Sequence, residues 1–291
     1  MERFLSSRMW KYSIASCIVL LYLLCVTHGR AYKQQTFFNE KDYKHNQQTF
    51  NNRNKYKQQT FNNRKEYKQQ TSNEFDVLIF TQQWPFTACL VWTQDSSTHS
   101  CVLPNHDSWT IHGIWPTKYN TLGPQFCNNT SKFDPSFLKP IEKELTENWL
   151  DIHKGSKPYS FWKHEWDKHG TCAVAMKPLD NEFNYFQTGL KLLKEYNMMD
   201  VLAKANILPG NRYKVEDMLT KIEKILTKKG QIMCIIDKET QESYVMEIRI
   251  CFDKTLQLID CNGIYHFPTN CNRSKPIIYP SNTTEYNVIK I

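Results

Sequence analysis

Short apolar runs that end at prolines or polar turns predict β-strands at both ends of the region that begins near residue 74. The run EFDVLIFTQQWP (74–85) contains a continuous apolar stretch and stops at Pro85, as a buried strand would. A second β-rich run, SWTIHGIWP (108–116), stops at Pro116. Three further apolar runs, separated by short polar turns, predict strands at 231–237, 243–252 and 256–261.

Helical patterns occupy the middle of this region. In the segment 134–153, Asp134 is a suitable N-cap and Pro135 suits the first turn. The segment 161–169 is also predicted to be helical, and Gly170 is placed to end that helix. Amphipathic spacing predicts two more helices, at 181–196 and 215–230. Strands, then helices, then strands indicate an α+β fold with a largely antiparallel central sheet flanked by helices.

The first thirty residues differ from the rest. A short basic lead precedes an apolar run at 13–26, which is short for a membrane-spanning helix and typical of a signal-peptide core. We therefore expect a signal peptide at 1–30, with an uncleaved signal anchor as the alternative. After its removal the protein is expected to have no membrane association and to be secreted, or to reach a lysosome-like compartment.

Residues 31–73 form a tandem repeat. Copies of a YKQQTF-like motif begin at Tyr32, Tyr43, Tyr56 and Tyr67, at intervals of about eleven residues. Gln, Asn and Lys dominate each copy, so the segment buries too little apolar surface to offset the cost of ordering its backbone, and we predict disorder. The repeats carry a net charge of +6 and residues 1–30 carry +3, whereas residues 74–291 are nearly neutral at −1. The repeats are either a solvated spacer or a weak attractor of polyanions.

The cysteines support an exported, disulfide-stabilised single domain at 74–291. Two of the ten lie in the apolar run near the N-terminus. The other eight are Cys89, Cys101, Cys127, Cys172, Cys234, Cys251, Cys261 and Cys271. An even number in an exported chain implies four disulfides, and the absence of a C-x-x-C pair argues against a metal site. Sequons for N-glycosylation occur at Asn128, Asn129, Asn272 and Asn282.

The segment FWKHEWDKHGTCA (161–173) carries the densest chemistry. On a helix at about 100° per residue, His164, Glu165, Lys168 and His169 share one arc, with large aromatic residues in or beside it. One alternative is a surface helix with chance charge pairs, although such a helix would rarely interleave bulky aromatics. Zinc is another, but the two histidines are spaced i,i+5 rather than i,i+4, and a lysine lies between them. We therefore predict no metal and no cofactor.

Histidine, carboxylate and lysine without a metal suit phosphoryl transfer on RNA. A base takes the proton of the 2′-OH, an acid protonates the leaving 5′-oxygen, and cationic groups stabilise the phosphorane between them. The base and the acid must flank the phosphorus, so a second histidine is expected from elsewhere in the chain. His112, at the end of the strand 108–116, is the candidate. Taken alone, a histidine in such a setting is more often a packed core residue.

Together the two segments resemble the signature pair of the ribonuclease T2 family, the secreted acid ribonucleases of transferase type. TIHGIWP resembles the first motif and KHEWDKHGTC the second, in the expected order. TQQWP before Cys89, the spacing of the cysteines and IYHFP near Cys271 also fit, so the resemblance covers about residues 74–280. The repeats at 31–73 have no counterpart in the family pattern.

The resemblance implies a role for each site residue. His169 would be the general base and His112 the general acid. Lys168 and Glu165 would stabilise the phosphorane, and His164 would position the phosphate. The product would be a 2′,3′-cyclic phosphate that is slowly opened to a 3′-phosphate. The substrate would be RNA and not DNA, which lacks the nucleophile.

The resemblance also implies the disulfide pairs Cys89–Cys101, Cys127–Cys172, Cys234–Cys271 and Cys251–Cys261. Base recognition departs from the family pattern, since Thr117 stands where many members carry an acidic or amide residue. We therefore expect low base specificity. Trp115 either stacks on a base, which would tolerate any sequence, or packs in the core. Tyr119 is a weaker candidate for the same pocket.

The sequence thus predicts a monomeric, secreted T2-type endoribonuclease that cleaves single-stranded RNA. A non-catalytic RNA-binding or signalling protein on the same fold is the alternative, although His112 and His169 are both present. A third hypothesis is a secreted scaffold in which the repeats are the functional part.

Overall fold

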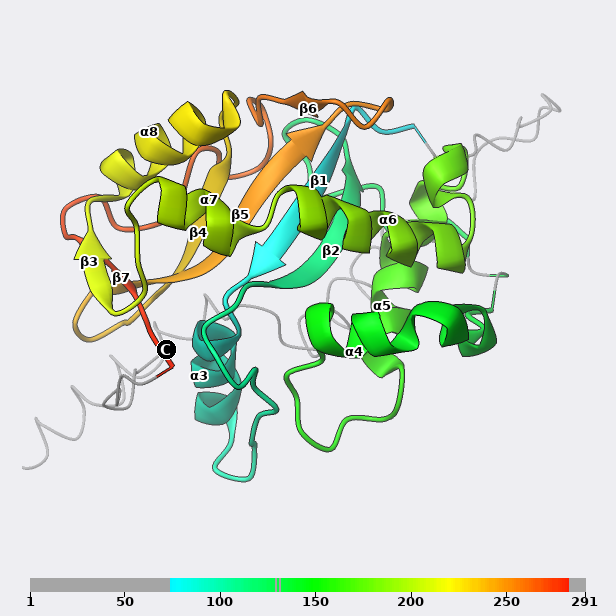
Figure 1. The fold of residues 1–291 in the computed structure, drawn as a ribbon, viewed down its shortest axis with the longest axis horizontal. Helices are drawn as coiled ribbons and strands as arrows, with labels where there is room; N and C mark the ends of the chain where they lie inside the picture. The colour runs from blue at the N-terminus through cyan, green and yellow to red at the C-terminus, as the bar shows by residue number, and fades with distance from the viewer. Residues whose placement is uncertain (1–73, 129, 131, 283–291) are drawn as a thin grey trace, which may run out of the picture. The chain divides into compact units, whose positions relative to one another are not determined.

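A mostly antiparallel sheet forms the centre of the computed structural model, which describes residues 74–128, 130 and 132–282 (Figure 1). In this described part seven strands form one sheet, in which β1 lies between β2 and β5, and β4 and β6 also pair with β5. The strands are β1 (Val77–Gln83), β2 (Thr110–Thr117), β3 (Asn211–Tyr213), β4 (Gln231–Ile236), β5 (Ser243–Phe252), β6 (Leu258–Ile259) and β7 (Ile277–Tyr279). The predicted signal peptide (1–30), the repeats (31–73) and Asn129 lie outside the described residues.

Helices flank this sheet, and α6 and α7 run across it in Figure 1. The α-helices are α3 (Pro85–Asp95), α4 (Glu142–Asn148), α5 (Ser160–Lys168), α6 (Glu182–Glu195), α7 (Met198–Lys204) and α8 (Val215–Leu226). Three short 3-10 helices are η1 (Pro135–Ile141), η2 (Gly170–Cys172) and η3 (Lys177–Leu179). The predicted α+β class is confirmed. No helix within the described ranges is both long and apolar enough to cross a membrane.

The period of two along β1 divides the core. Every residue of β1 is buried, as the apolar run predicts. Leu78 and Phe80 point into the large apolar cluster shared with α6, α7 and α8, while Val77 and Ile79 point into a smaller cluster that includes the Cys251–Cys261 disulfide. A central strand covered on both faces has no solvent-facing side, which explains the unbroken apolar run Val77–Phe80; the polar residues that follow, Thr81 to Gln83, are buried as well.

The predicted helices at 181–196 and 215–230 are confirmed as α6 and α8, but the segment 134–153 is divided. Asp134 caps it by accepting a hydrogen bond from the backbone N–H of Ser136, as expected. The first part is the 3-10 helix η1, with Pro140 inside it, and only 142–148 is α-helical. Proline lacks the N–H that an α-helical bond would need at that position.

Of three expectations about chain breakers, the one for Pro116 is wrong, and Pro85 and Gly170 do more than end an element. Pro85 does more than stop β1, because it opens the unpredicted helix α3, where its missing N–H is harmless. Pro116 does not stop β2, which continues to Thr117 as an edge strand that tolerates proline. Gly170 does not cap α5 in a left-handed conformation. It opens η2, and a Cβ there would collide with the ring of Trp166.

The free edge of β2 is covered by side chains. The hydroxyl of Tyr185, on α6, donates to the carbonyl of Ile114 at 2.9 Å and accepts from its N–H at 3.3 Å. The indole N–H of Trp149 donates to the carbonyl of His112 at 2.9 Å. These bonds satisfy backbone groups that the sheet leaves unpaired, as an edge strand requires.

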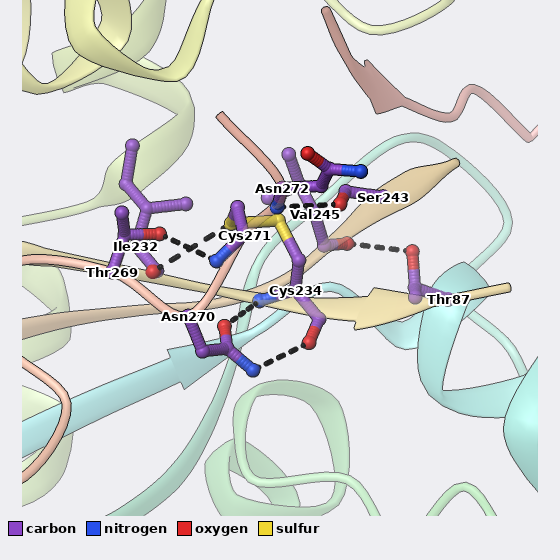
Figure 2. The surroundings of a disulfide bond; sticks show 9 residues. All are labelled: Thr87, Ile232, Cys234, Ser243, Val245, Thr269, Asn270, Cys271 and Asn272. Carbon is purple, nitrogen blue, oxygen red and sulfur yellow. Dashed lines mark hydrogen bonds between the residues drawn. A yellow bond between two sulfur atoms is a disulfide. The ribbon is translucent and has the colours of Figure 1, made fainter. Parts of the chain in front are cut away.

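Four disulfides occur in the described region, and they are the pairs that the family resemblance implies: Cys89–Cys101, Cys127–Cys172, Cys234–Cys271 and Cys251–Cys261. Figure 2 shows how Cys234–Cys271 joins β4 to the segment before β7. Beside it, the side chain of Asn270 accepts from the N–H of Cys234 and donates to its carbonyl, in place of a neighbouring strand.

Replacement of Tyr185 by phenylalanine tests the edge covering. Tyr185→Phe leaves the buried N–H and C=O of Ile114 without their partner, so we expect the free energy of unfolding to fall by about 1–3 kcal/mol. Urea denaturation measures this change. Tyr265→Phe, at an exposed tyrosine, is the control and is expected to change stability by less than about 0.5 kcal/mol. Equal stability of the two variants would contradict the assigned role of the Tyr185 hydroxyl.

Candidate active site

His112 occupies a β-bulge in β2. The register between β1 and β2 shifts at this point: Thr81 pairs with Gly113 and Gln82 with Ile111, so His112 has no partner on β1. A bulge turns its extra side chain away from the regular alternation of the strand. The imidazole is 26% exposed, and its Nδ1 lies 2.6 Å from Oε1 of Glu247 on β5. The bulge therefore places one ring nitrogen against a buried carboxylate.

Two buried tryptophans anchor α5 beside β2. The indole N–H of Trp162 donates to the carbonyl of Trp149 at 2.8 Å, and the ring of Trp166 meets that of Tyr185 edge-on. Glu165 lies on the same buried side of the helix, and so does His169 just beyond its end. Residues one turn apart share a helix face, so both are carried toward β2.

The four ionisable residues of this segment differ in exposure. Glu165 and His169 are buried, Lys168 is half-buried and His164 is exposed. The segment before the Cys127–Cys172 disulfide borders the same side, since the backbone N–H of Phe126 donates to the carbonyl of Lys168. The arc predicted from the helical projection thus runs from a buried interior to an open rim.

Trp115 connects β2 to α5. Its indole N–H donates to Oε2 of Glu165 at 3.0 Å, and its ring centroid lies 5.0 Å from that of His112 and 5.3 Å from that of His169. A Cβ on Gly113 would collide with both Oε2 of Glu165 and the Trp115 indole, so glycine permits this close approach. The structure therefore brings the motifs of both segments together around one ring.

The surroundings of His112 and His169 shift their pKa values in opposite directions. Burial lowers the pKa of His112, but its hydrogen bond with Glu247 and the negative charges of Glu247 and Glu165 outweigh this effect, so the pKa is raised. His169 has no such partner, and burial, with Lys168 and His164 nearby, holds its pKa well below the usual value. At neutral pH this favours a charged His112 and a neutral His169.

The remaining groups of α5 are shifted mainly by burial. Burial raises the pKa of the Glu165 carboxyl, against the opposing effects of His112 and Trp115. Burial lowers the pKa of the Lys168 ammonium. For His164, whose side chain is exposed at the rim, partial desolvation of the ring by its neighbours and the charge of Lys168 lower the pKa to about 4, so its ring is neutral near pH 7.

The sequence patterns missed Glu247 and Arg249. They alternate with apolar residues in the interior of β5, where SYVMEIRICF was predicted only as a strand. Two opposite charges at i and i+2 in such a strand share one face, and this signal could have marked a site. Glu247 is 7% exposed and accepts hydrogen bonds from Nε and Nη2 of Arg249.

The two candidate base-binding residues lie in different settings. The guanidinium carbon of Arg249 lies 5.0 Å from the ring centroid of Trp115, and the indole N–H of Trp115 donates a hydrogen bond to Glu165. Tyr119 is 39% exposed on the loop after β2, where its N–H donates to Asp76 and its ring lies beside Gly263. The contacts of Trp115 support a packing role. Whether either residue also stacks on a base stays a prediction.

In the described residues, no group of three or more His, Cys, Asp and Glu side chains is arranged to hold a metal ion. The sequon residue Asn128 is exposed and accepts hydrogen bonds from the backbone and hydroxyl of Thr130. Asn272 is half-buried, accepts in the same way from Ser274, and donates to a backbone carbonyl. Asn282 is exposed near the end of the described residues.

Comparisons with known proteins point to one family. The model of the Ribonuclease T2 family matches residues 75–261. Ribonuclease Oy of Magallana gigas is 35% identical over 212 residues, which are 71% of this chain and 97% of that protein. Human ribonuclease T2 is 33% identical over 194 residues, covering 65% of this chain and 72% of that protein.

Solved structures show the same fold. The crystal structure of RNase NT in complex with 5′-AMP aligns with a TM-score of 0.59 and 31% identity, covering 72% of this chain and 99% of that one. The crystal structure of human RNase T2 aligns with a TM-score of 0.58 and 30% identity, covering 71% of this chain and 98% of that one.

Gly113→Ala tests the close approach at the centre of the site. The added methyl group overlaps Glu165 and the Trp115 indole, so one of them must move, and we expect a loss of about 1–3 kcal/mol in stability. The indole N–H resonance of Trp115, assigned with Trp115→Phe, should shift upfield as its hydrogen bond breaks. Gly123→Ala is the control, because its methyl group meets only Gln125, at the side-chain Cγ (3.0 Å) and the backbone N (3.2 Å), and touches neither Glu165 nor Trp115. An unchanged Trp115 resonance would contradict the contact.

Proposed function

The chain belongs to the ribonuclease T2 family and is a T2-type endoribonuclease, and we propose that it cleaves single-stranded RNA by metal-free transphosphorylation with low base specificity. The observation that supports this mechanism best is the contrast between His112 and His169. Both rings border Trp115, and their pKa values are shifted in opposite directions. Such a pair supplies a general acid and a general base at the same pH.

His169 is the general base in this mechanism. Its lowered pKa keeps the imidazole neutral at neutral pH, and its Nδ1 is buried without a hydrogen-bond partner among the described residues. The other nitrogen, Nε2, then accepts the proton of the 2′-OH as that oxygen attacks phosphorus. Burial makes the ring a weak base, and the approach of an anionic phosphate would raise its basicity.

His112 is the general acid. Glu247 binds Nδ1, so Nε2 is the nitrogen available to the substrate. The imidazolium donates its proton to the 5′-oxygen as the bond between phosphorus and that oxygen breaks, which leaves a 2′,3′-cyclic phosphate. In the slower second step the roles reverse: His112 takes a proton from water, which attacks phosphorus, and His169 returns a proton to the 2′-oxygen, giving a 3′-phosphate.

The other residues of α5 act on the phosphorane. Lys168 supplies positive charge at the rim of the site, and Glu165, with its raised pKa, can donate a hydrogen bond in its protonated form. His164 is exposed and neutral near pH 7, so it would position the phosphate by a hydrogen bond rather than by charge.

The substrate follows from this chemistry. RNA provides the 2′-oxygen nucleophile and DNA does not. The complex of RNase NT with 5′-AMP supports a nucleotide site on this fold. Thr117 supports low base specificity, because its hydroxyl donates to the carbonyl of Trp115 at 3.0 Å and its side chain is buried. The acidic and amide side chains that many family members carry there, and that would read a base edge, are absent from that position.

We further propose the domain order predicted from sequence: a signal peptide at 1–30, repeats at 31–73 and the ribonuclease domain at 74–291. Secretion is the proposed destination, with a lysosome-like compartment as the alternative. The protein is proposed to act as a monomer. Asn128 is the best placed of the sequons, since it is exposed and its amide oxygen already contacts the hydroxyl of Thr130.

Cleavage of RNA in the presence of EDTA tests the proposed function. The full-length protein should convert a single-stranded RNA oligonucleotide to fragments ending in 2′,3′-cyclic phosphate, identified by mass, and should leave the matching DNA intact. His112→Phe should lower kcat by about 10²–10⁴-fold, the usual contribution of a general acid. Loss of cleavage in EDTA, or full turnover by His112→Phe, would refute the mechanism.

The pH dependence of kcat/KM tests the two assignments together. Activity requires neutral His169, whose pKa lies well below 6.5, and charged His112, whose pKa lies above 6.5. The profile should be bell-shaped, with the acidic limb below pH 6.5 and the basic limb above it. Measurement from pH 3 to 9 at constant ionic strength gives both limbs. A single limb, or a maximum with both limbs on one side of pH 6.5, would contradict the paired roles.

A further inference from the structure

A buried ion pair stands behind the proposed acid. Oε1 of Glu247 lies 2.6 Å from Nδ1 of His112, and Oε2 accepts from both Nε and Nη2 of Arg249. Each oxygen of the Glu247 carboxylate therefore forms a hydrogen bond, one with His112 and the other with Arg249. Glu247 and Arg249 are 7% and 17% exposed, so solvent screens these contacts weakly.

Arg249 is held in turn by the protein around it. Its Nη1 donates to Oε1 of Gln231 at 3.3 Å, and its guanidinium lies over the ring of Trp115. The side-chain amide of Gln231 donates to the carbonyl of Tyr265 at 2.8 Å. A continuous series of hydrogen bonds thus runs from the loop after β6 to the ring of His112.

The strand register explains how β5 reaches a histidine two strands away. Glu247 and Arg249 project from one face of β5, and on the intervening strand β1 they pair with Gln83 and Thr81. Threonine is small, which leaves room for Arg249 to extend toward Trp115. The bulge in β2 turns His112 toward the same face.

We propose that Glu247 is a positioning residue that holds His112 as an imidazolium with Nε2 directed at the leaving group, and that Arg249 keeps Glu247 ionised and oriented. The role of Glu247 rests on the proposed role of His112 as general acid. Glu247 does not take the transferred proton. The proton leaves His112 from Nε2, while Nδ1–H remains bonded to the carboxylate throughout.

Among the charged groups that face His112, Glu247 contributes most to keeping its ring protonated. Burial of the ring disfavours its cationic form, and Arg249 does so too. His153, His164 and His169 add repulsion whenever they are protonated. Glu165 is the other carboxylate, but its Oε1 is 3.9 Å from Nε2 and burial raises its own pKa.

Glu247, by contrast, remains ionised. Burial alone would raise its pKa, yet Arg249 and His112 lower it to about 2. A carboxylate that stays charged across the working pH range, at hydrogen-bond distance from Nδ1, is the partner that keeps an imidazole protonated.

Glu247→Gln tests this role, and Glu242→Gln is the matched control. Glu242, the residue before β5, also forms an ion pair with an arginine, Arg212, at 2.7 Å, but no contact between it and His112 occurs in the described region. Glutamine at 247 preserves the shape, and its carbonyl oxygen can still accept from Nδ1–H. Its NH2 group cannot accept from Arg249, so the charge is removed together with the hydrogen bonds from Nε and Nη2 of Arg249. The basic limb of kcat/KM should move down by about one to two pH units, the usual effect of one neighbouring charge.

The loss should depend on pH. At pH 8 we expect kcat/KM of Glu247→Gln to fall about 10–100-fold, because each unit of pKa is a factor of ten in the protonated fraction. At pH 5, where His112 would still be charged, the loss should be only a few-fold. Glu242→Gln should show neither effect. A basic limb that stays in place together with an unchanged pKa of His112, or an equal loss at every pH, would overturn the inference and leave Glu247 as a structural residue only.

NMR titration of the His112 Cε1–H separates this inference from the proposed function. If the pKa of His112 falls in Glu247→Gln but the basic limb stays in place, Glu247 does hold the charge and His112 is not the acid. If the pKa of His112 is unchanged, the inference fails whatever the activity.

Glu247→Asp is the second variant, and it covers the case in which Glu247→Gln folds poorly. It keeps the charge while withdrawing the carboxylate, so the basic limb should stay within about half a unit of the wild-type position even if kcat falls. A limb that moves as far in Glu247→Asp as in Glu247→Gln would contradict a role for the charge.

Discussion

The bulge at His112 in the edge strand β2 is the constraint on which the site depends. It removes His112 from the pairing with β1, so Trp149 must satisfy its carbonyl and Glu247 can reach its ring. Gly113, the next residue, then leaves space for Glu165 to approach Trp115. One irregularity in one strand thereby joins groups from β2, β5 and α5. A regular strand would place none of them in these positions.

The pKa values of His112 and His169 shift in opposite directions because only His112 has an anionic partner. His112 has Glu247, and its pKa rises. His169 has none, and its Nδ1 lacks a hydrogen-bond partner within the described residues. A buried polar group without a partner costs about 1–3 kcal/mol, and such costs are typical of functional sites. In the proposed mechanism this cost at His169 accompanies its role as the neutral base, while the ring of Trp115 lies beside both histidines.

Local patterns predicted much of this structure. The spacing of apolar residues predicted β1, β5, α6 and α8, and the segment 161–169 was predicted as the helix that the structure shows as α5. The patterns failed where a residue acts through a distant partner. Glu247 belongs to a strand whose pairing places it beside His112, 135 positions away. Tyr185 and Trp149 cover the edge of β2 from separate helical regions, and no spacing in the sequence announces that contact. Pro85 was ambiguous because proline suits both a strand end and a helix start.

We propose that the fold divides the roles of acid and base between His112 and His169 before any substrate binds. Neutron diffraction from crystals of the full-length protein, exchanged into deuterated buffer near pH 6.5, tests this division. His112 should carry deuterium on both ring nitrogens, with Nδ1 bonded to Glu247, while His169 should carry deuterium on one nitrogen only. A singly deuterated His112, or a doubly deuterated His169, would contradict the division of roles.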